Sequence, residues 1–272
     1  MFFSRLKKLL PILSKRQEFV LVTLILTGSL TATQLFIGGL RLEILIALSL
    51  LAYLLSAYVL RQDLTGWEYA TLLILPAFYT GAVYLFYLLL PVRWLTRLPI
   101  ASLYAVGMYA ILLTENIYNV AAERNIQLLR AAHSVGFLLT LVTVFFLVDT
   151  VVSLHLPFYF NALLTFIVIL PLTLQVLWSM VLSPGIDTAV WTGSGVVTLI
   201  LVELVTVFSF WPIKTTIEAL FVTTAFYSLV GMTQQQLVGR LFTKTAREFF
   251  LVLGAVFILV ILTTRWGAGV LQ

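Results

Sequence analysis

The stretch SVGFLLTLVTVFFLVDTVVSL, residues 134–154, contains a single ionisable side chain, Asp149. A run of about 20 mostly apolar residues is long enough to cross the hydrocarbon core of a bilayer as a helix. Similar runs follow one another along the chain, and hydrophobic residues make up 61% of its 272 residues. Charged residues make up only 10%, against about 25% in soluble domains. Lipid is therefore the predicted solvent for most of this chain.

Nine such runs are predicted to span the membrane. They cover residues 18–38, 42–60, 69–90, 98–117, 134–154, 158–182, 190–210, 215–232 and 248–264. Helices satisfy their own backbone polar groups in lipid, whereas a β-barrel would show short alternating segments separated by turns. The sequence therefore predicts an all-α polytopic transmembrane helix bundle with eight or nine spans. It forms a single transmembrane domain over 1–272, in which 1–17 is a basic N-terminal interfacial segment.

The positions of the lysines and arginines predict the orientation. With the N-terminus inside, the inner segments hold eleven of these residues and the outer segments hold five. Such an excess marks the cytoplasmic side of a membrane protein. We therefore expect a multi-pass protein of the cytoplasmic (inner) membrane, with its N-terminus inside and its C-terminus outside. The lipid bilayer is its predicted partner, and no nucleic acid is expected, because the net charge of +5 is explained by orientation.

The most polar stretch is LLTENIYNVAAERNIQLLRAAHSVGF, residues 112–137. Polar residues recur in this stretch every three or four positions, with the apolar Ile126 filling one step. Residues with this spacing share one face of a helix. They are Glu115, Asn119, Glu123, Arg130 and His133. We predict that residues 115–130 continue the fourth span as a helix at the inner interface. Two interpretations remain open. The face is either a solvated cap between two spans or an inner platform that binds a membrane or cytoplasmic protein partner or an anionic head group.

Three segments carry a resemblance to a known family. They are ENIYNVAAERNIQLLRAAH at 115–133, LFTKTAREFF at 241–250 and TTRWG at 263–267. Together they resemble an uncharacterised family of bacterial multi-pass integral membrane proteins, of the domain-of-unknown-function type. The resemblance implies a membrane fold over most of the chain. It implies no catalytic residue, cofactor or substrate.

A second candidate site comes from ionisable residues within or beside the spans, where charge is costly and therefore a functional hypothesis. The predicted topology places this outer polar cluster near the outer leaflet: Glu43, Arg93, Arg97, Asp149, Glu203 and Glu218. Such a cluster would bind a lipid phosphate or pyrophosphate, or form a proton or cation path in which Glu203 titrates. Glu203 is expected to face the bundle interior, near a polar group of another span. For Glu43 and Glu218, simple interfacial pairs with Arg41 and Lys214 are the alternative.

Several kinds of chemistry are absent from the sequence. There is no cysteine, so thiolate metal sites and cysteine nucleophiles are excluded. His133 and His155 lie at opposite ends of one predicted span, about 33 Å apart along a helix. At this distance the two histidines are not expected to bind one metal ion or one haem together. Neither HExxH nor a P-loop occurs, and no cofactor is expected.

Three classes of function follow from these observations. The first is a non-enzymatic membrane binding or scaffold subunit that uses the inner platform. The second is a proton- or cation-coupled transporter or channel that uses the buried acids. The third is an enzyme acting on a lipid-linked phosphate substrate at the outer leaflet, for which no catalytic motif is present. The sequence favours the first class.

Overall fold

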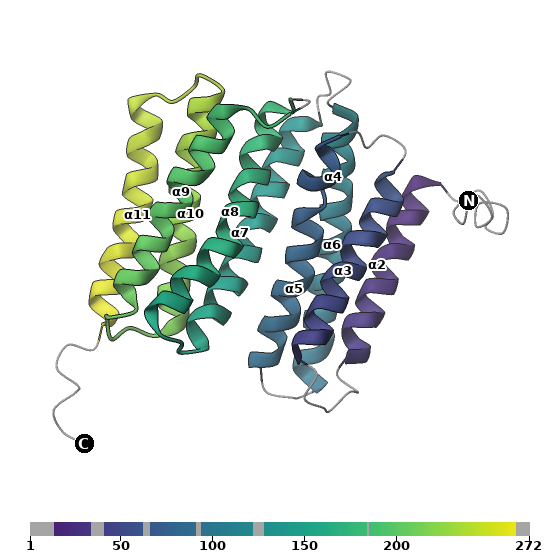
Figure 1. Ribbon diagram of the computed structural model, residues 1–272, viewed down its shortest axis with the longest axis horizontal. Coiled ribbons are helices and arrows are strands. Elements are labelled where there is room, and N and C mark those ends of the chain that lie inside the picture. The colour runs from purple at the N-terminus through teal and green to yellow at the C-terminus, as the bar shows by residue number, and fades with distance from the viewer. Residues whose placement is uncertain are drawn as a thin grey trace.

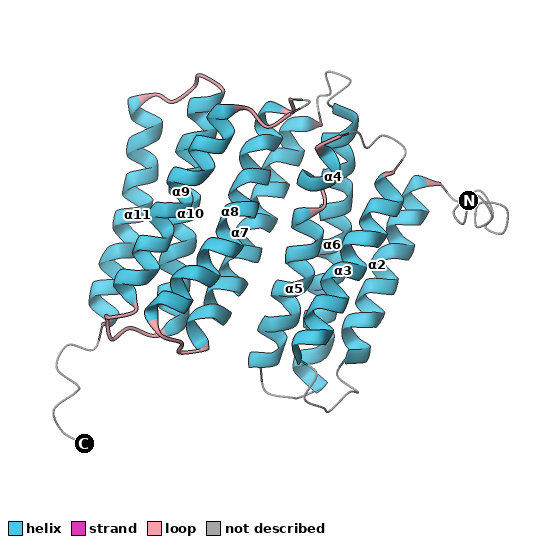
Figure 2. Cartoon of the chain, viewed as in Figure 1, coloured by secondary structure: helices cyan, strands magenta, loops and turns pink. Residues whose placement is uncertain are grey.

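The computed structural model describes residues 14–33, 41–61, 66–90, 94–121, 128–183 and 185–264, and no strand occurs within these ranges. The helices are α2 (Lys15–Ala32), α3 (Arg41–Leu60), α4 (Glu68–Thr71), α5 (Ile74–Leu89), α6 (Trp94–Ala121), α7 (Leu129–Ser153), α8 (Phe158–Val181), α9 (Thr188–Phe208), α10 (Thr215–Leu237) and α11 (Thr243–Thr263). The long helices run side by side and are joined by short loops (Figure 2).

The predicted fold class is confirmed. Eight helical segments in the described part of the chain are long and apolar enough to cross a membrane, and they match the second to ninth predicted spans. The remaining predicted span is α2, whose first turn carries three charged side chains, Lys15, Arg16 and Glu18. Helix α2 packs against α3 and α6. Its predicted extension to residue 38 lies outside the described residues.

The helices form two groups joined by α7. Helices α2, α3, α5 and α6 pack on one another, as do α7 to α11, and α7 also packs against α5 and α6. Helix α8 adds contacts with α4 and α5. Because α7 lies between the groups, it contributes many buried residues, among them Gly136, Thr140, Val144 and Asp149. Figure 1 shows α2 beginning and α11 ending at opposite ends of the bundle. We call the end of the bundle at which α6 ends and α7 begins the α6–α7 end. The opposite end, at which α7 ends and α8 begins, is the α7–α8 end.

The surface of the bundle suits lipid. Large apolar side chains point outward from several helices, such as Leu24, Ile46 and Leu262, the last of which is 78% exposed. So much exposed apolar surface is unfavourable in water but favourable in a bilayer. Buried threonines donate their hydroxyls to the carbonyl four residues earlier, as Thr140 does to Gly136 at 2.9 Å. Such bonds satisfy hydroxyl groups in an apolar interior, whereas within the described residues no partner is present for the hydroxyls of the buried residues Thr23, Ser56, Thr165, Ser194 and Thr198.

The polar stretch at 112–137 folds differently from its prediction. Helix α6 ends at Ala121, Leu128 lies in a turn, and Arg130 belongs to α7, which returns toward the other end of the bundle (Figure 1). The expectation of one continuous helix over 115–130 is therefore wrong, because the chain reverses between α6 and α7. Residues 122–127, with Glu123, lie outside the described residues.

Candidate functional site

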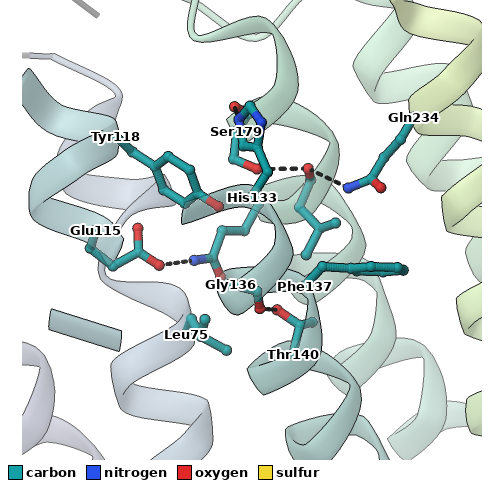
Figure 3. A pocket seen from close by; sticks show the side chains of 11 residues that line it. Leu75, Glu115, Tyr118, His133, Gly136, Phe137, Thr140, Ser179 and Gln234 are labelled. Carbon is teal, nitrogen blue, oxygen red and sulfur yellow. Dashed lines mark hydrogen bonds between the residues drawn. The ribbon is translucent and has the colours of Figure 1, made fainter. Parts of the chain in front are cut away.

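A fully buried carboxyl group lies near the α6–α7 end. Glu115 of α6 has no exposed surface, and its Oε1 accepts a hydrogen bond of 2.6 Å from Nε2 of Gln175 on α8. Its other oxygen, Oε2, has no hydrogen-bonding partner, and neither has Oε1 of Gln175. Figure 3 shows this acid facing the side chains of the surrounding helices. Glu115 is therefore part of neither a solvated cap nor an exposed platform.

Tyr118 and His133 cover Glu115 on the side toward the end of the bundle. Tyr118 follows Glu115 by one turn of α6 and donates its hydroxyl to the carbonyl of Ala132 at 3.0 Å. His133 Nε2 lies 2.9 Å from the carbonyl oxygen of Ser179. Because a carbonyl only accepts, Nε2 carries the proton in this arrangement. The rings of Tyr118 and His133 are 5.4 Å apart and tilted, so they form a lid of two aromatic side chains.

The space around Glu115 is small. This Glu115 chamber has a volume of about 10 Å³ and is lined by Leu75, Glu115, Tyr118, His133, Gly136, Phe137, Thr140, Gln175, Val176, Ser179 and Gln234. A polar cavity needs about 10–15 Å³ to hold one water molecule. The chamber therefore has the size of a single water site, next to oxygen atoms that lack a donor.

A much larger cleft opens at the same end of the bundle. This arginine cleft has a volume of about 1090 Å³ and is lined by Leu129, Arg130, His133, Ser134, Phe137, Met180, Gln234, Gln235, Val238 and Arg240. His133, Phe137 and Gln234 line both the cleft and the chamber. Gln234 is nearly buried, and its Nε2 lies 3.5 Å from the carbonyl of Val176. These shared side chains form the wall that separates the cleft from Glu115.

The predicted inner platform is divided by the structure. Asn119 is buried and donates from Nδ2 to the carbonyl of Leu60 at 3.3 Å, which fastens α6 to the end of α3. Glu115 lines the chamber, and His133 lies between the chamber and the cleft. Arg130 is exposed at the mouth of the cleft. Binding by these residues stays a prediction, but most of those described point into the bundle.

The outer polar cluster is only partly described. Asp149 and Glu218 are 5% and 4% exposed, whereas the side chain of Glu43 is exposed. Arg93 and the side chain of Arg97 lie outside the described residues.

The predicted inward position of Glu203 is wrong, because its side chain is exposed on the surface of α9. Helix α9 buries the face that carries Leu201 and Val205, and Glu203, two residues from each, lies on the opposite side.

Sequence reasoning missed several residues of this site. Gln175 is a lone amide in the middle of an apolar run, and a search limited to ionisable residues passes over it. Gln234 and Gln235 lie beyond the predicted span 215–232, but α10 extends to Leu237 and carries both. A search that also counts Asn and Gln side chains in or beside a predicted span could have found them. Like an ionisable group, an amide in lipid needs a hydrogen-bonding partner.

Comparison with known proteins identifies the family. The chain belongs to the family described as protein of unknown function (DUF5656), which it matches over residues 19–263. This agrees with the resemblance seen in the sequence for nearly the whole chain, while a bacterial origin stays a prediction. No curated protein matches the chain, and no solved structure matches it.

Proposed function

We propose that this member of a family of unknown function is a proton-coupled transporter of a small anionic solute. The arginine cleft is its solute site, and Glu115 is its proton-carrying group. One observation carries the proposal: a fully buried carboxyl is separated from a large open cleft by side chains that line both cavities. Ligand sites commonly have volumes of about 300–1,000 Å³, so the cleft has ample room for a metabolite-sized solute.

The charged lining of the cleft supports an anion as the solute. Arg130 and Arg240 both line it, and both are exposed. A guanidinium group binds carboxylate or phosphate through two parallel hydrogen bonds. Ser134 and Gln235 add uncharged hydrogen-bonding groups beside the arginines. Among the described lining residues there is no acid at the mouth that would repel an anion.

The surroundings of Glu115 support its role in carrying a proton. An ionised carboxyl that has one amide partner and no cation nearby is costly in a low-dielectric interior. The surroundings of Glu115 therefore favour its protonated, neutral form. An anion that enters a bilayer also pays a large cost for its charge. A proton that travels with the anion reduces this cost. A buried acid next to an anion site is therefore a physically reasonable coupling device.

A current measurement tests the proposal. Purified protein in proteoliposomes is adsorbed on a solid-supported membrane and exposed to a step in pH. We expect a transient current from proton movement to Glu115 in the unmodified protein and none in Glu115→Gln, which keeps the shape and the bond to Gln175. Glu203→Gln, which removes an exposed acid of another helix, is the matched control and should retain the current. An equal current in Glu115→Gln would overturn the proposal.

The subunit and enzyme classes receive less support. The outward apolar faces, including that of α11, need no protein partner because lipid covers them. A lipid-phosphate enzyme was expected to use the predicted outer polar cluster. The described acids of that cluster do not share one pocket, since Glu43 and Glu203 are exposed.

A further inference from the structure

We propose that a second cavity, at the α7–α8 end, binds a primary ammonium group. The cavity has a volume of about 320 Å³ and lies between the loop that joins α7 to α8 and the loop that joins α9 to α10. Asn161, His155 and Glu218 line it, together with the hydroxyl side chains of Ser209 and Thr215 and the rings of Phe158, Phe210 and Trp211. We call it the aromatic cavity. It shares no residue with the arginine cleft or the Glu115 chamber.

Two buried acceptor groups in this cavity lack a donor. Glu218 is 4% exposed, and its Oε1 has no hydrogen-bonding partner. Asn161 is 5% exposed; its Nδ2 donates to the carbonyl of Leu156 at 3.3 Å, while its Oδ1 has no partner. Buried polar groups without partners are rare and costly. A primary ammonium group offers three donors and no acceptor, which matches what these oxygen atoms lack.

The histidine of the cavity adds a further acceptor. His155 Nδ1 lies 2.8 Å from the carbonyl oxygen of Ser153, so Nδ1 carries the proton. In a neutral imidazole, Nε2 is then an acceptor. The cavity therefore combines a carboxyl, an amide oxygen and an imidazole nitrogen, all of which accept hydrogen bonds.

The aromatic side chains suit a cation. Phe158 and Phe210 lie with ring centroids 5.4 Å apart, and Trp211 also lines the cavity. Aromatic faces attract an ammonium group within about 6 Å through the ring quadrupole. An uncharged polar ligand would gain much less from these rings.

No basic side chain other than His155 competes for Glu218 within the described lining of the cavity. Lys214, the partner predicted from the sequence, is exposed and does not line it. Asp149 of α7 adds a second nearly buried acid beside the start of α10, where Thr216 donates a hydrogen bond to it. A cationic ligand would stabilise the ionised form of these carboxyl groups, which is costly in a buried site without a cation.

Calorimetric titration of the full-length protein in detergent with ethanolamine hydrochloride tests the proposal. We expect saturable binding, and none with ethylene glycol, which replaces the ammonium group by a hydroxyl. Glu218→Gln should weaken binding by about tenfold or more, because it removes the negative charge that pairs with the ammonium group and leaves only a neutral amide oxygen as acceptor. Asn161→Asp should strengthen binding, and the double variant should recover part of the loss. Glu203→Gln and Glu115→Gln should bind as the unmodified protein does.

Two sources could supply the ammonium group, a free amine or the head group of phosphatidylethanolamine. Nanodiscs distinguish them. If the head group is the ligand, ethanolamine binds in discs of phosphatidylglycerol and is excluded in discs that also contain phosphatidylethanolamine. If a free amine is the ligand, both discs give the same affinity. Unsaturable titration, equal binding of ethylene glycol, or unchanged binding in Glu218→Gln would overturn the proposal.

Discussion

Gly136 allows α6 and α7 to approach closely beside Glu115. A Cβ atom at this position would lie 2.6 Å from the hydroxyl oxygen of Tyr118 and 3.1 Å from Cγ2 of Thr114. The absence of a side chain therefore lets Tyr118 reach the carbonyl of Ala132. The lid over the chamber depends on this contact.

Gly136→Ala should lower the stability of the bundle by about 1–3 kcal/mol, the usual cost of overpacking a well-packed site. Thermal unfolding in detergent measures the effect. Gly195→Ala is the control, since nothing lies within 4 Å of its added Cβ. In a Tyr118→Phe background, which lacks the obstructing oxygen, the same Gly136→Ala change should cost clearly less. An equal loss in both backgrounds would show that Tyr118 is not the obstruction.

The acids show what the sequence can and cannot predict at the residue scale. The rule that a charged group in a span faces inward succeeds for Asp149 and Glu218, both nearly buried, and fails for Glu203. The nearest neighbours of Glu203 in the sequence are apolar, and Thr206 is the one polar residue a single turn away, so the pattern does not distinguish the face toward lipid from the face toward protein. The partner of Glu115 was also hidden, because Gln175 lies 60 residues away in the sequence.

At the scale of elements, α7 and α10 build the arginine cleft. Helix α7 contributes Arg130 and Ser134, and α10 contributes Gln234 and Gln235. The sequence predicted the middles of both helices but not their ends. The predicted span ends at residue 232, whereas α10 continues to Leu237, and its amides Gln234 and Gln235 face a cleft rather than lipid.

The chain has no cysteine, so single substitutions can be labelled without background. Ser134→Cys and Gln235→Cys should react readily with a membrane-impermeant maleimide, because water in the cleft supports the thiolate. Leu199→Cys, on the outward face of α9 and 55% exposed in the bundle, should stay unreactive because lipid covers it. The rates of labelling in vesicles are compared. Rapid labelling at residue 199 would contradict a transmembrane α9.

At the scale of the whole molecule, the basic residues gather at one end. In the described part of the chain, the α6–α7 end carries Lys15, Arg16, Arg61, Arg130, Arg240, Lys244 and Arg247, whereas the α7–α8 end carries Arg41 and Lys214. Basic residues gather on the cytoplasmic side of membrane proteins, which predicts that the α6–α7 end, with the arginine cleft, faces the cytoplasm.

Reporter fusions test this orientation. A fluorescent protein in the loop at 183–187 should mature, because that loop lies at the α6–α7 end. A phosphatase fused after residue 272 should be active on the other side, since nine membrane-crossing helices, with α2 included, would place the N-terminus and the C-terminus on opposite sides. An inactive phosphatase there would mean that one helix does not span. Helix α2, with three charges in its first turn, would be the first to re-examine.

Helix α11 packs mainly against one helix, α10, and this has a consequence for biosynthesis. All residues of α11 are described, and Val260 is the one that is well buried; its early part rests on α10 through Phe249, beside Gly231. Neither the arginine cleft, the Glu115 chamber nor the aromatic cavity uses a residue of α11. During translation, the ribosome therefore finishes every wall of the three cavities before it delivers this helix. Until α11 leaves the translocon, lipid covers the side of α10 on which α11 will pack. Helix α11 then needs only to displace this lipid.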